Sequence, residues 1–154
     1  MTPMESSQVD PIPDGQRLFA YLIVTNAARA LEFYERAFGA RESYRLEMGD
    51  RIGHAEFAFE GVTVMLSDEF PELGFMGPTG STAVSIMVYV ADVDALTQRA
   101  VAAGATLEKP VRDEFYGDRV ASLRDPFGHR WLLHSRREVV SPEEMRRRMA
   151  SAAG

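Results

Sequence analysis

The sequence predicts an α+β fold built from two tandem βαβββ units, followed by a C-terminal helix. The main observation is an internal repeat: an apolar run leading into a helical segment occurs at residues 22–26 and again at 88–92. The tripeptide Gly-Asp-Arg at 49–51 recurs at 117–119. In each half, three strand-like runs follow the helical segment. A repeat of this kind indicates one supersecondary unit used twice, here with its strands and helix in the same order.

The first unit begins with a strand and a helix. Residues 18–24 are apolar and rich in aromatic and branched side chains, which predicts a strand. Asn26 is a suitable N-cap for the following helix, and Gly39 ends it. Apolar side chains recur in this segment at helical spacing: Ala30, Leu31, Phe33, Tyr34 and Phe38.

Three further strands complete the first unit, at residues 42–48, 52–59 and 62–67. They are separated by Gly49-Asp50 and by Glu60-Gly61, and both pairs have the composition of hairpin turns.

The second unit repeats this order. Residues 83–90 form the first strand, and Asp92 caps a helix that runs to Ala103. The strands that follow are expected at 107–115, 119–124 and 129–134. Asp-Pro-Phe-Gly at 125–128 suits a type I turn between the last two strands. Ser141, Pro142 and Glu144 form a capping box that opens the C-terminal helix.

These elements divide the chain into three parts. Residues 1–16 are expected to form a flexible tail, residues 17–136 the folded domain, and residues 137–154 the last helix and its end. Within the domain, the units span about 17–69 and 82–136, joined by a linker at 70–81 that is rich in Gly and Pro. The linker also carries Phe70, Phe75 and Met76, which either hold the loop on the domain or make it a lid over a pocket.

Composition excludes some functions. The net charge is −6, from 17 basic and 23 acidic side chains, which argues against nucleic acid as a partner. The basic run at 146–148 lies beside Glu143 and Glu144, as on a solvated helix face. The chain has no cysteine, which fits a cytoplasmic protein, and residues 1–16 are not apolar enough for a signal peptide or membrane anchor.

Several motifs occur in the order and spacing of one known protein family. They stand at residues 21–24, 33–34, 38–40, 54–56, 65–69, 116–119 and 125–131. With these motifs, residues 17–136 resemble the vicinal oxygen chelate superfamily, which includes glyoxalase I, extradiol dioxygenases and the bleomycin- and fosfomycin-resistance proteins. Within it, the chain is similar to the PhnB-like glyoxalase/bleomycin-resistance branch. The resemblance implies that the strands of both units form a cupped mixed sheet around one cavity.

Metal-dependent relatives hold a divalent ion with four ligands, usually His and Glu, on the first and fourth strands of each unit. The matching positions here are Phe19, Met65, Ser85 and Leu132. None of these side chains is a carboxylate or an imidazole, the groups that such a site needs. Their sequence neighbours do not coordinate either, so we expect neither a metal nor another cofactor.

Strand alternation gives an independent prediction of the cavity wall. On each strand one face is purely aliphatic, as expected against a helix, and the other mixes aromatic, Met and hydroxyl side chains. The mixed faces predict a binding surface made of Phe19, Tyr21, Met65, Ser67, Ser85, Met87, Tyr89, Arg130 and Leu132, with His134 at its end. Such a surface suits an apolar or aromatic molecule, and Arg130 could pair with a carboxylate or phenolate on it. Alternatively, these residues fill the cup as core.

Candidate catalytic residues are few. His54 and Glu56 share a strand face and could act as a general base and its partner, or simply form a surface pair. His134 is a third candidate, although a histidine at a strand end is commonly in contact with solvent. His129 is expected to face away from the cup, and the neighbours Asp118 and Arg119 to form a turn with a local ion pair.

The favoured function is therefore a metal-free protein that binds a small, largely apolar or aromatic molecule, acting as a homodimer by analogy with the family. The alternative is a metal-free isomerase or lyase that uses His or Tyr acid–base chemistry. A metal-dependent lyase or dioxygenase is a third possibility, but its ligands are not at the expected positions.

Overall fold

The computed structural model describes residues 8–152 and has the predicted α+β order. The first unit contains β1 (Tyr21–Val24), α1 (Ala27–Phe38), β2 (Arg41–Met48), β3 (Arg51–Phe59) and β4 (Val62–Asp68). The second contains β5 (Ser85–Tyr89), α2 (Val93–Ala103), β6 (Thr106–Asp113), β7 (Asp118–Arg124) and β8 (Arg130–Arg136). A 3-10 turn, Pro71–Leu73, lies in the linker, and α3 (Pro142–Ala152) follows the second unit.

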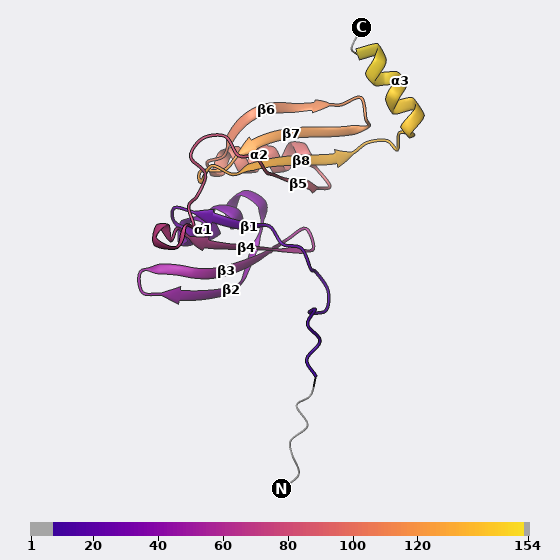
Figure 1. Cartoon of the computed structure of the whole chain (residues 1–154). Helices are drawn as coiled ribbons and strands as arrows, with labels where there is room; N and C mark the ends of the chain where they lie inside the picture. Colours follow the sequence, from indigo (N-terminus) through magenta and orange to yellow (C-terminus); the bar gives the residue numbers. More distant parts are fainter. Residues whose placement is uncertain (1–7, 153–154) are drawn as a thin grey trace.

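Each unit forms its own four-stranded mixed sheet. The strand orders are β1-β4-β3-β2 and β5-β8-β7-β6, so the two sheets have the same topology. In each, the first and last strands of the unit pair in parallel, and the remaining pairs are antiparallel. Figure 1 shows the two sheets at opposite ends of the folded domain with α1 and α2 near its centre. The predicted tandem units are confirmed.

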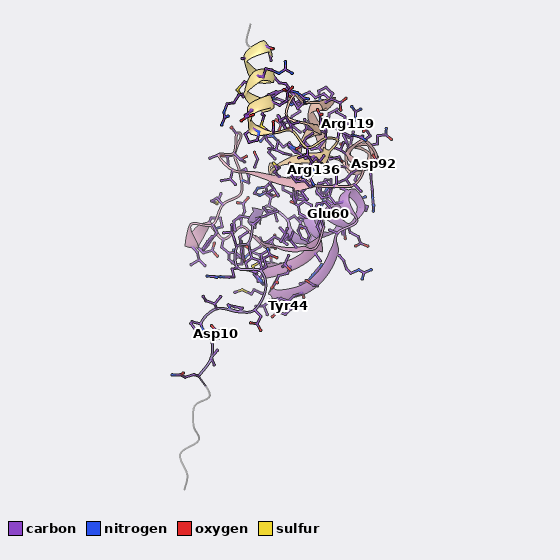
Figure 2. All side chains as sticks on the ribbon, turned by 90° about the vertical axis from the view of Figure 1, so that its right-hand side faces the viewer. Asp10, Tyr44, Glu60, Asp92, Arg119 and Arg136 are labelled. Atoms are coloured by element: carbon purple, nitrogen blue, oxygen red, sulfur yellow. The ribbon has the colours of Figure 1, made fainter. Side chains whose placement is uncertain are left out.

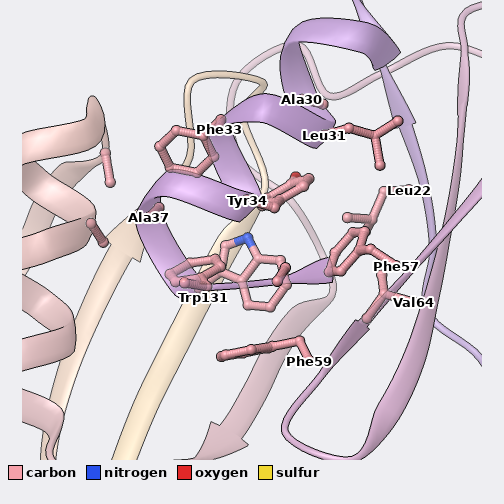
Figure 3. Packing of buried hydrophobic residues seen from close by; sticks show 14 of the residues in the cluster. Leu22, Ala30, Leu31, Phe33, Tyr34, Ala37, Phe57, Phe59, Val64 and Trp131 are labelled. Atoms are coloured by element: carbon pink, nitrogen blue, oxygen red, sulfur yellow. The ribbon is translucent and has the colours of Figure 1, made fainter. Parts of the chain in front are cut away.

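The hydrophobic core combines side chains from both units (Figure 3). Trp131 of β8 is buried against Tyr34 and Phe38 of α1 and against Phe59 of β3, with ring centroids 4.8–6.2 Å apart. Aromatic rings at these distances and tilts attract each other beyond simple area burial. The helix-facing side of each sheet therefore packs inward, and its other face is left on the outside of the domain.

Asp125 connects the core to the turn before β8. One of its carboxylate oxygens accepts hydrogen bonds from the Tyr34 hydroxyl (2.6 Å) and the Trp131 indole N–H (2.9 Å). The other accepts from the backbone N–H groups of Phe127 and His129. A buried carboxylate is stable only when hydrogen bonds of this kind satisfy it, so Asp125 holds the two units in one register.

The predicted caps are present. The side chains of Asn26 and Asp92 accept hydrogen bonds from the first turns of α1 and α2, and Gly39 ends α1 at a φ of 69°. Asp68, at the end of β4, accepts from the backbone N–H of Ala27 (2.7 Å) and of Ile52 (2.6 Å). These contacts satisfy N–H groups at helix and strand ends that have no partner within their own element.

The two ends of the described chain differ. Gln16 exchanges two hydrogen bonds with the Thr63 backbone, so the expected tail is attached to β4 at this residue. Residues 1–7 of the expected tail lie outside the described residues. At the other end, α3 projects from the domain (Figure 1) and is tied to it by Arg148, which donates to the Phe115 carbonyl and pairs with Glu138. No helix among residues 8–152 is long and apolar enough to cross a membrane.

Candidate binding surfaces on the outer sheet faces

Alternation along the strands places side chains as predicted. On β1, Leu22 and Val24 are buried in the core, whereas Tyr21 is half exposed on the outer face. On β8, Trp131 and Leu133 are buried towards α1. Arg130, Leu132 and His134 of the same strand line a concavity on the outer face.

The outer faces do not meet in one cavity. Tyr21 and Ser67 line a concavity on the first sheet, whereas Ser85, Arg130, Leu132 and His134 line another on the second. In Figure 2, the labelled Tyr44 of the first unit and Arg136 of the second lie at different heights of the domain. Within one chain, the two sheets therefore line separate concavities and not one shared cavity. The reason is the core: Trp131 packs under α1, so the sheets face away from each other.

The remaining predicted residues lie outside these concavities. Phe19 and Met65 are partly buried, and Met65 is in register with Tyr21 on the neighbouring strand. Met87 and Tyr89 are about half exposed on the outer face of β5.

The first concavity has a volume of about 350 Å³ and an almost entirely apolar wall. It is lined by Tyr21, Met48, Gly53, Ser67, Phe70, Leu73 and Phe75. Met48 lies so close over Gly53 that a Cβ there would collide with its sulfur. Glycine at this position therefore lets the methionine side chain lie on the sheet.

The linker forms one wall of this concavity. The backbones of Phe70 and Phe75 exchange two hydrogen bonds, 2.8 and 3.1 Å long, which close a small loop. Phe70 is buried and carries the Arg51 guanidinium 4.1 Å from its ring centre, so it holds the loop on the domain. Phe75 and Leu73 remain exposed on the wall. Phe70 thus fills the predicted role of holding the loop on the domain, and the role of the loop as a lid stays a prediction.

Beside the first concavity, three polar side chains form a hydrogen-bonded row. The Tyr21 hydroxyl is 2.9 Å from His54 Nδ1, and His54 Nε2 is 2.9 Å from Glu56 Oε2. Because a carboxylate only accepts, His54 carries its proton on Nε2, and Tyr21 then donates to Nδ1. Burial raises the pKa of Tyr21 above its usual value. The sequence predicts Tyr21 only as part of the pocket wall. It does not predict the hydrogen bond that links Tyr21 to the His54–Glu56 pair.

The second concavity, about 530 Å³, is more polar. Its charged side chains are Glu108, Lys109, Arg112 and Arg130. Arg130 donates to Glu108 at 2.9 Å, and this bond lowers the pKa of the Glu108 carboxyl. His134 lies at the end of the concavity beside Tyr116, whose ring is stacked 6.2 Å from the imidazole.

Two predictions about this surface are wrong. His134 is not a solvent-exposed strand end, because only 7% of it is accessible. Asp118 forms no local ion pair with Arg119: it is buried, accepts a 2.7 Å hydrogen bond from the Tyr89 hydroxyl, and lies 3.0 Å from His134 Nδ1. The bond to the carboxylate raises the pKa of Tyr89.

Strand alternation explains the second error. Neighbours on a strand point to opposite faces, so Asp118 turns towards His134 while Arg119 pairs with Asp94 (2.8 Å) and Asp113 (3.1 Å). The same alternation along β7 could have placed Asp118 on the face of Val120 and Ser122, which line the second concavity. His129 was correctly expected to face away: it lies 2.9 Å from the Ile23 carbonyl.

The donor set does not fit a metal. The four family positions carry Phe19, Met65, Ser85 and Leu132, of which only Ser85 offers an oxygen. Within residues 8–152, no three His, Asp or Glu side chains are grouped closely enough to hold a metal ion. Divalent ions in this fold need imidazole and carboxylate ligands, so the geometry supports no metal-dependent step.

Comparisons with known proteins agree with this architecture. An uncharacterised protein of Mycobacterium tuberculosis H37Rv is 41% identical over 140 residues, covering 87% of this chain and 82% of that protein. The crystal structure of TioX from Micromonospora sp. ML1 has 31% identity and a TM-score of 0.65, covering 79% of this chain and 99% of that one.

A third relative shares the fold at lower identity. The fosfomycin resistance protein FosX of Listeria monocytogenes, solved with Mn(II) and sulfate, has 22% identity and a TM-score of 0.63. The similarity covers 89% of this chain and 98% of FosX. The model of one protein family matches residues 17–133. With the tandem βαβββ units already described, this match shows that the chain belongs to the Glyoxalase/Bleomycin resistance protein/Dioxygenase superfamily.

Proposed function

We propose that this protein binds a small, largely apolar or aromatic molecule without the help of a metal. The observation that carries the proposal is the first concavity, whose wall is apolar apart from the hydroxyls of Tyr21 and Ser67. Three of its side chains, Met48, Leu73 and Phe75, are more than half exposed although they are large and apolar. Covering such a surface with an apolar ligand is favourable, at roughly 25 cal/mol per Å² removed from water.

The proposal is tested by paired substitutions in the linker. Phe75→Ala should weaken binding of the neutral probe 4-nitroanisole about tenfold, because the loss of aromatic contact area costs ~1–2 kcal/mol. Met76→Ala is the matched control: Met76 is 53% exposed, Phe75 is 52% exposed, and only Phe75 lines the concavity. Isothermal titration calorimetry measures both. Equal affinities for the two variants, or no binding by the unaltered protein, would reject the proposal.

Independence from metal follows from the missing ligands and is part of the proposal. Desalted protein should bind 4-nitroanisole equally well with and without a chelator. Nickel, zinc or iron that is retained in stoichiometric amounts, and whose removal abolishes binding, would contradict it. The PhnB-like branch and a cytoplasmic location remain predictions from the motifs and from the absence of cysteine.

The protein is also proposed to act as a homodimer. Both outer sheet faces are open, with Tyr21, Met87 and Tyr89 each about half exposed. A second copy could cover these faces and close the concavities, as the resemblance to the family implies. Sedimentation at micromolar concentration should then give twice the chain mass. Only a 17.2 kDa species would contradict the dimer.

A second candidate function is supported by the row Tyr21–His54–Glu56. A tyrosine hydroxyl that donates to a histidine, itself held by a carboxylate, is suited to proton transfer in an isomerase or lyase. Metabolite extract should be incubated with the protein and with its His54→Gln variant, and followed by mass spectrometry. Compounds that the unaltered protein converts and the His54→Gln variant only binds indicate an enzyme. Compounds that both proteins return unchanged indicate simple binding.

A further inference from the structure

His134 is held in one orientation by groups that the proposed function does not use. Its Nδ1 lies 3.0 Å from Asp118 Oδ2, the oxygen that also accepts the Tyr89 hydroxyl at 2.7 Å. Tyr89 and Tyr116 flank the imidazole, with ring centroids 5.6 and 6.2 Å from it. Because the ionised carboxylate can only accept, the proton of neutral His134 is on Nδ1.

The other ring nitrogen is therefore a free acceptor. His134 Nε2 has no hydrogen-bond partner among residues 8–152. His134 lines the second concavity although only 7% of its surface is exposed. A nearly buried acceptor on a residue that lines a concavity favours a ligand group that can donate a proton.

The charged side chains around the second concavity favour an anionic group on a ligand. Lys109, Arg112 and Arg130 line it together with one carboxylate, Glu108. Arg130 is paired with Glu108 and Arg112 with Glu114, but Lys109 forms no ion pair among the described residues.

We propose that the second concavity binds the acidic O–H group of an aromatic ligand, with His134 Nε2 as proton acceptor. The ligand's O–H bond breaks as the N–H bond forms, which gives a phenolate-type oxyanion and an imidazolium. The carboxylate of Asp118 stabilises the imidazolium, and the cationic wall stabilises the oxyanion. Asp118 is a positioning residue, since it contacts His134 and not the ligand. The inference rests on the proposed function only for the aromatic nature of the ligand.

The test uses 4-nitrophenol, whose anion absorbs visible light and whose neutral form does not. The full-length protein should bind the anion at least about tenfold more tightly than the neutral form, so that the bound probe ionises at a lower pH than in free solution. His134→Gln should abolish this shift, and Asp118→Asn should reduce it, because an amide does not stabilise an imidazolium. Arg146→Gln, on the surface of α3, is the control and should leave the shift unchanged.

The neutral analogue 4-nitroanisole separates this inference from the proposed function. It should bind all four proteins equally, which also shows that the variants are folded. Binding of 4-nitrophenol without a spectral shift, or a shift that persists in His134→Gln, overturns the inference while the proposed function stands. Failure of both probes to bind overturns both.

Discussion

At the scale of single residues, two aspartates of the second unit have similar surroundings and different structural roles. Asp125 and Asp118 are both buried, and each accepts a hydrogen bond from a tyrosine hydroxyl, at 2.6 and 2.7 Å. Both carboxylate oxygens of Asp125 accept hydrogen bonds from the core and from the turn before β8. Asp118 holds a histidine that borders an open concavity. The difference lies in the strand face, because only the face away from the helices can receive a ligand.

The Tyr34–Asp125 bond should contribute measurably to stability. Tyr34→Phe removes the hydroxyl that donates to this buried carboxylate, and should lower the free energy of unfolding by about 1–3 kcal/mol. Urea denaturation measures the change. Tyr44→Phe is the control, since half of Tyr44 is exposed and the ring lies on an outer strand. An equal effect of both substitutions would contradict the assigned role.

The same pair predicts a pH dependence. Burial raises the pKa of Tyr34 well above its usual 10.0, and the nearby Asp125 carboxylate raises it further. The folded state thus keeps a neutral phenol while the unfolded chain ionises near the usual value. Tyr34 therefore contributes its full stabilisation below about pH 10, and this contribution falls as the pH rises above it. The Tyr34→Phe variant should lose less stability than the unaltered protein between pH 9 and 11.

At the scale of elements, α3 depends on one arginine. Arg148 donates to the Phe115 carbonyl and pairs with Glu138 and Glu144, while no strand or helix within residues 8–152 packs closely against α3. An isolated helix of this length is marginal in water. Arg148→Gln should therefore increase amide hydrogen exchange throughout α3. Arg146→Gln, on the same helix, should change it little, and equal exchange in the two variants would rule out the tether.

The sequence predicts elements better than their relative placement. The repeat and the strand alternation correctly gave the order of strands and helices, the helix caps and the shared face of Arg130, Leu132 and His134, opposite the face that packs on the helix. These features depend on residues close in sequence. The separation of the two concavities was missed, because it depends on Trp131 packing under α1, a contact between distant segments. The resemblance to the family implied one cavity and gave no information about this contact.

At the scale of the whole molecule, the fold buries one side of each sheet and leaves the other open. The first open face is apolar and partly covered by the Phe70–Phe75 loop; the second carries His134 and the cationic side chains. None of the four family metal positions offers a metal-binding ligand set. In the proposed function, these faces bind their ligands by contact and hydrogen bonding without a metal.

An apolar molecule is proposed to bind on the first outer face. The most direct test of this binding is NMR of protein labelled at the methionine methyl groups, titrated with 4-nitroanisole. Met48 and Met149 are matched reporters, because they are 56% and 57% exposed and only Met48 lines the first concavity. The Met48 methyl signal should shift saturably while that of Met149, on α3, stays unchanged. An unshifted Met48 signal at saturating probe, or equal shifts at both residues, would contradict it.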